Sequence, residues 1–172
     1  DLDSGNAQAH YQKGLSLAAT GRKDDAIHAF DRALGIRPDL LEALLHRGMV
    51  LTELGRNDDA IESFGKILTI DPSNAEAWYL KGSALSSLGR YEDAITAFNR
   101  ALEIRPEYVS AYYEKGRALS RMAKYTEAAL AFDNALSFQP KVVDALYYKG
   151  HAQIRLGRHE DAEYSFDQAL RI

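Results

Sequence analysis

Apolar residues recur along the chain at the spacing of one face of an α-helix. In segment 91–104 they alternate with charged residues so that one side of a helix is apolar. That side consists of Ala94, Ile95, Phe98, Ala101 and Leu102. Segment 75–88 has the same helical spacing and contains no proline. Gly89 suits a left-handed helix end between the two segments, and Pro106 stops the second. This stretch predicts two helices joined by a short turn.

The whole pattern repeats every 34 residues. We call the residues at one position of successive repeats a column. The columns that share this period are Pro38, Pro72, Pro106, Pro140; Gly14, Gly48, Gly82, Gly116, Gly150; and Phe30, Phe64, Phe98, Phe132, Phe166. Such self-similarity is typical of repeat arrays, so we predict an all-α chain of helical hairpins. First helices are expected at 7–20, 41–54, 75–88, 109–122 and 143–156. Second helices are expected at 23–36, 57–70, 91–104, 125–138 and 159–171.

Two glycine columns carry structural predictions. A glycine inside a helix costs about 1 kcal/mol relative to alanine, so the Gly14 column is expected to let the two helices of a hairpin approach closely. The other column ends the first helices at Gly21, Gly55, Gly89 and Gly157, with Ala123 in the fourth slot. A left-handed alanine costs about 1–2 kcal/mol. Ala123 is therefore a predicted weak point, unless its turn takes another geometry.

Residues 75–106 (AEAWYLKGSALSSLGRYEDAITAFNRALEIRP) closely resemble the tetratricopeptide repeat. The matching signposts are Trp78, Gly82, Tyr91, Ala94, Phe98, Ala101 and Pro106. The resemblance covers essentially the whole chain. It departs from the family at a basic column, Lys13, Arg47, Lys81, Lys115 and Lys149, where the family usually has leucine. The resemblance implies a right-handed superhelical solenoid whose first helices line a concave groove for a peptide or helix of a partner protein.

The period also predicts the domain organisation. Residues 1–172 are expected to form a single array with repeats at 7–40, 41–74, 75–108, 109–142 and 143–172. Residues 2–6 are in phase with 70–74, so residues 1–6 are expected to be the tail of a preceding repeat. A fragment of a longer array is therefore the hypothesis. Its last helix, 159–171, is expected to leave Phe166, Ala169 and Leu170 open to self-association.

A partner would lie on the side of the first helices opposite Trp78, Gly82 and Leu85. We call this side the groove face. Its candidate binding residues are Tyr11, Leu15, Leu45, His46, Met49, Tyr79, Leu80, Ser83, Tyr113, Glu114, Arg117, Arg121, Tyr147, Tyr148, His151 and Arg155. Exposed tyrosines suit recognition, whereas the alternative is that they brace neighbouring hairpins. The face is apolar in its first half and basic in its second. The hypothesis is a partner segment with apolar anchors at one end and acidic side chains at the other.

Some members of the family grip a chaperone's terminal carboxylate with lysine and asparagine side chains. The matching positions from the first repeat are Tyr11, Leu15, His46, Glu76 and Leu80. Starting at the second repeat they are Leu45, Met49, Leu80, Ser110 and Glu114. Neither set keeps a clamp residue, so binding of the carboxylate-clamp type is not expected.

Composition narrows the function further. The net charge is −4 with both signs mixed along the chain, which argues against nucleic-acid binding. No apolar run is long enough to suggest a membrane helix. The chain has no cysteine, which excludes disulfides and thiolate metal sites and fits a cytoplasmic location.

No motif for catalysis or for a cofactor stands out. Paired acids, such as Asp24 with Asp25, are better explained by the helix dipole at the start of the second helices than by acid–base chemistry. The five histidines lack the i, i+4 spacing of a zinc site. The basic column from Lys13 could bind anions, but we expect its charges to reach water or neighbouring acids.

These observations favour a non-catalytic scaffold that binds another protein. One alternative is a substrate-holding or regulatory arm of a larger enzyme whose catalytic domain lies outside this sequence. A second alternative is a self-assembling structural array. Partner identity is open at this stage, because a repeat fold alone names no ligand.

Overall fold

The protein, described by a computed structural model, is built from two compact units that meet in the chain between Leu88 and Gly89. The structure describes residues 2–172, with side chains from Asn6 onward, and over this range it has ten α-helices and no strand. The first unit contains α1 (Leu2–Ala19), α2 (Lys23–Ile36), α3 (Leu41–Glu53), α4 (Asn57–Ile70) and α5 (Ala75–Ser87). The second contains α6 (Tyr91–Ile104), α7 (Val109–Arg121), α8 (Tyr125–Phe138), α9 (Val143–Arg155) and α10 (His159–Leu170).

The predicted all-α hairpin architecture is confirmed. Four of the five second helices have the expected bounds, and α10 ends at Leu170. The prediction was wrong at the start of the chain, where the first helix was expected to begin at residue 7. Residue 1 lies outside the described residues, but α1 already begins at Leu2. Ser4 stands where the next copy of the pattern has Pro38, and serine, unlike proline, can continue a helix.

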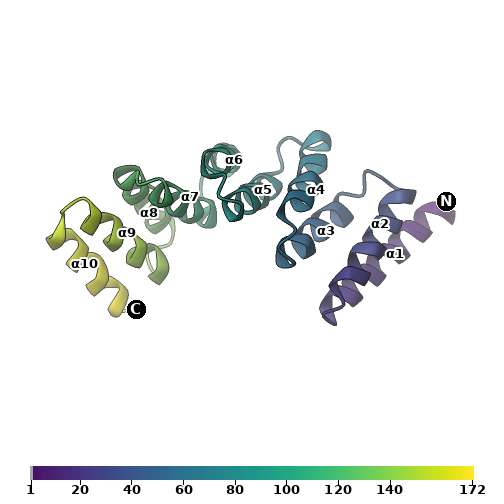
Figure 1. Cartoon of the computed structure of the whole chain (residues 1–172), viewed down its shortest axis with the longest axis horizontal. Coiled ribbons are helices and arrows are strands. Elements are labelled where there is room, and N and C mark those ends of the chain that lie inside the picture. Colours follow the sequence, from purple (N-terminus) through teal and green to yellow (C-terminus); the bar gives the residue numbers. More distant parts are fainter. Residues whose placement is uncertain (1) are drawn as a thin grey trace. The chain divides into compact units, whose positions relative to one another are not determined.

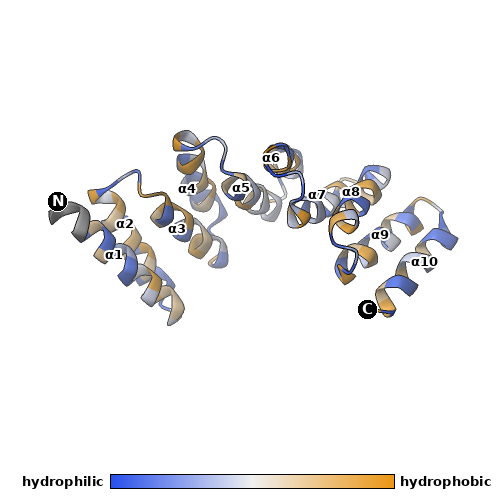
Figure 2. Cartoon of the chain, turned by 180° about the vertical axis from the view of Figure 1, so that it is seen from behind, coloured by the Kyte–Doolittle hydropathy of each residue, from blue (hydrophilic) through white to orange (hydrophobic). Residues whose placement is uncertain are grey.

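Within each unit a helix packs against its neighbours in the chain, as Figure 1 shows for α1–α4 and for α7–α10. First helices also contact the next first helix, in the pairs α1 with α3, α3 with α5, and α7 with α9. The helices are amphipathic: α2, α4 and α8 in Figure 2 each carry hydrophobic and hydrophilic residues. The first helices thus form one layer of each unit, and this layer carries the groove face.

Close helix crossings hold each hairpin together. A Cβ atom added to Gly48 would lie 2.5 Å from Cε1 of Phe64, well inside contact distance. The same clash, at 2.5–2.7 Å, recurs between Gly14 and Phe30, Gly116 and Phe132, and Gly150 and Phe166. Phe30, Phe64 and Phe132 are fully buried, so their rings cannot move aside at low cost. The predicted role of the helix glycines is confirmed at these four positions.

The turns between first and second helices also follow the prediction. Gly21, Gly55, Gly89 and Gly157 have φ between 74° and 77°. Ala123 adopts the same left-handed conformation with φ of 58°, so this alanine accepts strain that glycine avoids. The hydrogen bonds that close the end of α7, from Ala123 N–H to Ser120 O and from Lys124 N–H to Leu119 O, are the same as in the turns with glycine at Gly21, Gly55 and Gly157.

The basic column joins successive hairpins. Arg47 of α3 forms an ion pair with Asp31 of α2, with 2.7 Å between Nε and Oδ1. It also donates a hydrogen bond from Nη1 to Oγ of the buried Ser63. Lys149 of α9 repeats the pair with Asp133 of α8 at 2.6 Å. The predicted pairing of this column with neighbouring acids is therefore confirmed at Arg47 and Lys149.

Two other members of the basic column lack that acid. Gly65 and Asn99 occupy the positions of Asp31 and Asp133 for Lys81 and Lys115, respectively. Burial lowers the pKa of Lys115, an effect that Glu127 only partly opposes. A half-buried ammonium without a matched carboxylate is a local weakness in the second unit.

Paired glycine substitutions test the packing constraint. We expect Gly48→Ala to lower the free energy of unfolding by about 1–3 kcal/mol, because the buried Phe64 ring cannot yield to the new methyl group. Gly65→Ala serves as the matched control: it also lies inside a helix, but open space surrounds its missing Cβ. The control should gain up to about 1 kcal/mol from helix propensity. Urea unfolding followed by circular dichroism measures both, and a neutral Gly48→Ala would refute the close-packing account.

Supplying the absent acid should strengthen the second unit. We expect Asn99→Asp to raise the free energy of unfolding by about 0.5–1 kcal/mol at pH 7 by pairing with Lys115. Lys115 would hold the pKa of the new carboxyl below its unfolded value. The gain is therefore present above about pH 4 and is lost as the pH falls through the folded pKa. A double-mutant cycle with Lys115→Met checks the cause. An equal gain in the Lys115→Met background would show that the pair does not form.

Candidate functional site

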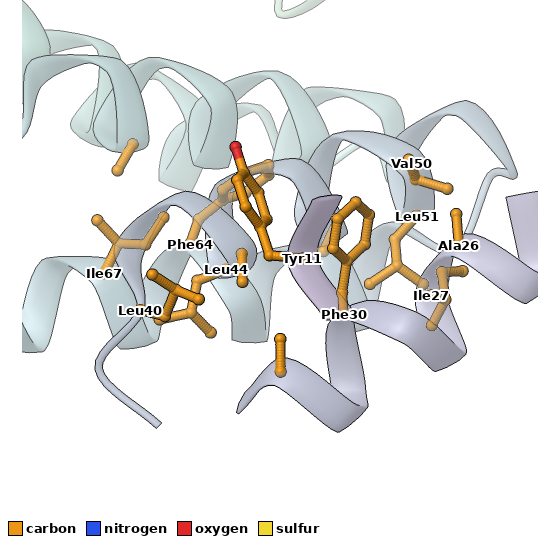
Figure 3. Packing of buried hydrophobic residues seen from close by; sticks show 14 of the residues in the cluster. Tyr11, Ala26, Ile27, Phe30, Leu40, Leu44, Val50, Leu51, Phe64 and Ile67 are labelled. Carbon is orange, nitrogen blue, oxygen red and sulfur yellow. The ribbon is translucent and has the colours of Figure 1, made fainter. Parts of the chain in front are cut away.

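The groove face of the first unit contains one clear correction. Tyr11 was expected on an exposed face, but only 7% of its surface is accessible, and it belongs to the hydrophobic core. Its ring centroid lies 6.1 Å from that of Phe30 and 5.6 Å from that of His46. Figure 3 shows the Tyr11 ring beside Phe30, with the hydroxyl oxygen pointing away from Leu40 and Leu44. Tyr11 therefore braces α1 against α3.

His46 holds this brace in place. Its Nδ1 lies 2.8 Å from the carbonyl oxygen of Glu42, which can only accept a hydrogen bond. Nδ1 therefore carries the hydrogen, and the Tyr11 hydroxyl oxygen, 3.3 Å from the same nitrogen, is a weaker second acceptor. Burial, with a smaller effect of the Glu42 carboxylate, raises the pKa of Tyr11. His46 is thus a packing residue on the groove face rather than a free polar contact.

The rest of this half is only partly available to a partner. Leu15, Leu45 and Leu80 are half-buried and pack against the core of the first unit. Tyr79 and Ser83 of α5 are also half-buried. Met49, by contrast, is 38% exposed. In the predicted apolar half, therefore, only parts of the leucine side chains and the flexible thioether of Met49 are accessible, and there is no broad apolar surface.

The second unit has an aromatic cluster on its groove face. Tyr113 of α7 contacts Phe132 of α8 and Tyr148 of α9, with ring centroids 6.1 Å and 6.0 Å apart. Tyr148 also stacks on Phe132 at 6.2 Å. Both tyrosines are half-buried. The bracing interpretation therefore holds for Tyr113, as it does for Tyr11.

Arg117 was expected to contribute free positive charge, but it is largely used within the protein. Nη1 of Arg117 lies 3.1 Å from Oε1 of Glu114, one helical turn earlier. Its guanidinium carbon also lies 5.7 Å from the ring centroids of both Tyr113 and Tyr148. Burial lowers the pKa of Arg117, but the Glu114 carboxylate together with Tyr113 and Tyr148 outweighs this effect and leaves that pKa raised. Arg117 and Glu114 are brought together as a neutral pair.

In addition to Tyr147, three predicted residues of the second unit are well exposed: His151, Arg121 and Arg155. Tyr147 is 47% exposed and lies edge-on to His151, with ring centroids 4.5 Å apart. Arg155 stacks its guanidinium 4.7 Å from the ring centroid of Tyr125. Within the described residues, neither Arg121 nor Arg155 has a carboxylate in ion-pair range. These residues combine an accessible aromatic surface with unneutralised positive charge.

The sequence missed a hollow at the first turns of α7 and α9. It is lined by Val109, Ser110 and Tyr113 of α7 and by Gln139, Lys141, Val142, Val143 and Asp144 from the turn before α9 and its start. Its volume of about 390 Å³ falls in the range of small ligand pockets. Helical-face reasoning could not find it, because part of the wall comes from the turn before α9.

The other candidate chemistry has structural roles. Acid pairs occupy the first turns of α2, α4, α6 and α10, as predicted. The second acid of a pair binds the arginine before the helix, as in Arg90 with Asp93 at 2.7 Å. None of the ten helices in the described part of the chain is long and apolar enough to cross a bilayer.

Comparison with known proteins agrees with this architecture. The family profile described as Tetratricopeptide repeat matches residues 1–40, 11–75, 45–109 and 113–172. A crystal structure of MamA is 32% identical, with a TM-score of 0.88 and 92% of each chain covered. A second MamA structure is 30% identical, with a TM-score of 0.91, and covers 96% of this chain and 91% of that one.

A more distant structure shares the fold. YrrB, described as a TPR protein with an unusual peptide-binding site, is 22% identical, with a TM-score of 0.79 and coverage of 94% of this chain and 84% of its own. No curated protein matches the chain in sequence.

The brace at Tyr113 can be tested by titration. Burial raises the pKa of Tyr113 to about 12, against the opposing effect of Arg117. Because the folded pKa exceeds the unfolded value, the stabilisation from Tyr113 is complete below about pH 10. It is lost as the pH rises towards 12. The ultraviolet difference titration between wild type and Tyr113→Phe should show this late ionisation. Ionisation near pH 10 would contradict burial of the phenol.

Proposed function

The chain belongs to the tetratricopeptide repeat family, and we propose on that premise that it is a non-catalytic interaction module holding a peptide segment of a partner protein. The observation that carries the proposal is the exposed Tyr147–His151 pair on the groove face of the second unit, whose first helices also carry the unneutralised Arg121 and Arg155. Large aromatic surfaces with a polar tip are favoured contact residues in protein interfaces.

Several observations support a peptide as the ligand. First helices contact each other within a unit, so their groove-face residues form a surface that spans more than one helix. A peptide can run across such a surface and contact residues from both helices. YrrB, which shares the fold, is described as having a peptide-binding site, and we propose the same kind of ligand here. The lack of cysteine suits a reducing compartment such as the cytoplasm.

The proposal narrows the predicted site. Tyr11 and His46 contribute stability rather than contacts with the partner, because they pack against each other between α1 and α3. Tyr147, His151, Arg121 and Arg155 of the second unit are the residues that we propose contact the partner. The remaining groove-face residues shape the surface by packing beneath it.

Panning a phage-displayed library of random peptides against the purified chain tests this proposal. Enriched peptides should bind the Tyr147→Ser variant at least about tenfold more weakly, because an exposed aromatic contact is lost. Tyr164→Ser is the matched control, since Tyr164 is also exposed, at 65%, and lies in α10 outside the proposed site. Circular dichroism verifies folding. If no peptide is enriched, or both variants bind like wild type, the proposal fails.

A further inference from the structure

The hollow and the two arginines stand at opposite ends of the same pair of helices. The hollow lies at the first turns of α7 and α9, between Val109, Tyr113 and Val143. Arg121 and Arg155 lie in the last turns of these helices. The surface between them carries the Arg117–Glu114 pair and His151, so the charge in the middle is already neutralised.

The geometry points to a specific kind of partner segment: an extended acidic peptide with one apolar anchor about five residues from its acidic side chains. This inference rests on the proposed function and specifies its ligand. The anchor would contact the valine and tyrosine side chains of the hollow, whose lining also includes Lys141 and Asp144. The acids would pair with Arg121 and Arg155, which no carboxylate of the described chain occupies.

The helix rise sets the spacing. Ser110, which lines the hollow, and Arg121 are eleven residues apart on α7 and lie within about 20° of each other around the helix. At 1.5 Å per residue they are about 16 Å apart along the axis. An extended chain advances about 3.3 Å per residue, so about five residues span that distance. A helical peptide would need roughly twice as many residues between its apolar anchor and its acidic side chains. The two peptide conformations are therefore distinguished by the spacing that binds most tightly.

Charge complementarity selects the acidic end. Arg155 is held by its stacking on Tyr125, so the N–H edge of its guanidinium stays available for a planar carboxylate. Arg121 is exposed and lies at the equivalent position of the preceding repeat. Two arginines at matching positions on adjacent helices can each meet one carboxylate of neighbouring acidic residues. A basic or neutral segment would leave both unsatisfied.

Fluorescein-labelled peptides of Gly, Ser and Ala, with one Leu and an Asp-Glu pair, provide the probe. The separation between Leu and the acids would be about two, about five or about nine residues. Fluorescence anisotropy should show the tightest binding, by at least about tenfold, at a separation of five. Replacing the acids by lysine should remove binding. An acidic peptide without leucine should bind no better than the mismatched spacings, and equal binding of that peptide would show a general anion effect and overturn the inference.

Variants separate this inference from the proposed function. Arg121→Ala and Arg155→Ala should each weaken binding of the matched peptide about tenfold, whereas Arg100→Ala, at an exposed arginine of α6 paired with Glu103, should leave it unchanged. Val143→Ser should also weaken binding of the matched peptide, because it removes an apolar side chain that lines the hollow. If panned peptides depend on Tyr147 but not on Arg121, Arg155 or spacing, the interaction module stands and this inference is wrong. If Tyr147→Ser has no effect either, both fall.

Discussion

The contact between a helix glycine and a buried phenylalanine ring determines how close the two helices of a hairpin can lie. At Gly14, Gly48, Gly116 and Gly150 the ring occupies the place of the absent Cβ atom. The close contact at this point also determines which side of the first helix faces the second helix and which side faces outward. A groove face with reproducible geometry depends on this packing, because polar contacts between exposed side chains contribute much less energy than a filled core.

Each unit builds its groove face from residues that serve two purposes. Tyr11 and Tyr113 point toward the groove side but are covered by an aromatic ring from the next first helix, His46 and Tyr148 respectively. These rings form a rigid base for the side chains that remain accessible. A surface of this kind loses little conformational entropy on binding, which favours affinity from few contacts. In the proposed function, specificity is assigned to a small number of exposed side chains such as Tyr147.

The period and its glycine and proline columns were sufficient to predict the helices and the close crossings, and of the two geometries left open at Ala123 the left-handed one is observed. The angular position of a residue around a helix predicts which way its side chain points but not how far it is buried. This is why Tyr11 was wrongly placed on the exposed surface. The missing signal was present in the sequence as aromatic pairs 35 residues apart, Tyr11 with His46 and Tyr113 with Tyr148. The neutral Glu114–Arg117 pair could also have been inferred from its i, i+3 spacing. The hollow beside α9 could not, because it depends on the path of a turn.

Each described helix packs only against helices near it in the chain. Nearly all contacts therefore form between residues close in sequence, and little loop-closure entropy is lost before they stabilise the chain. Such a protein is expected to fold quickly and in steps, with one hairpin providing the template for the next. The early hairpins can then acquire structure during synthesis on the ribosome, before the later ones have been translated.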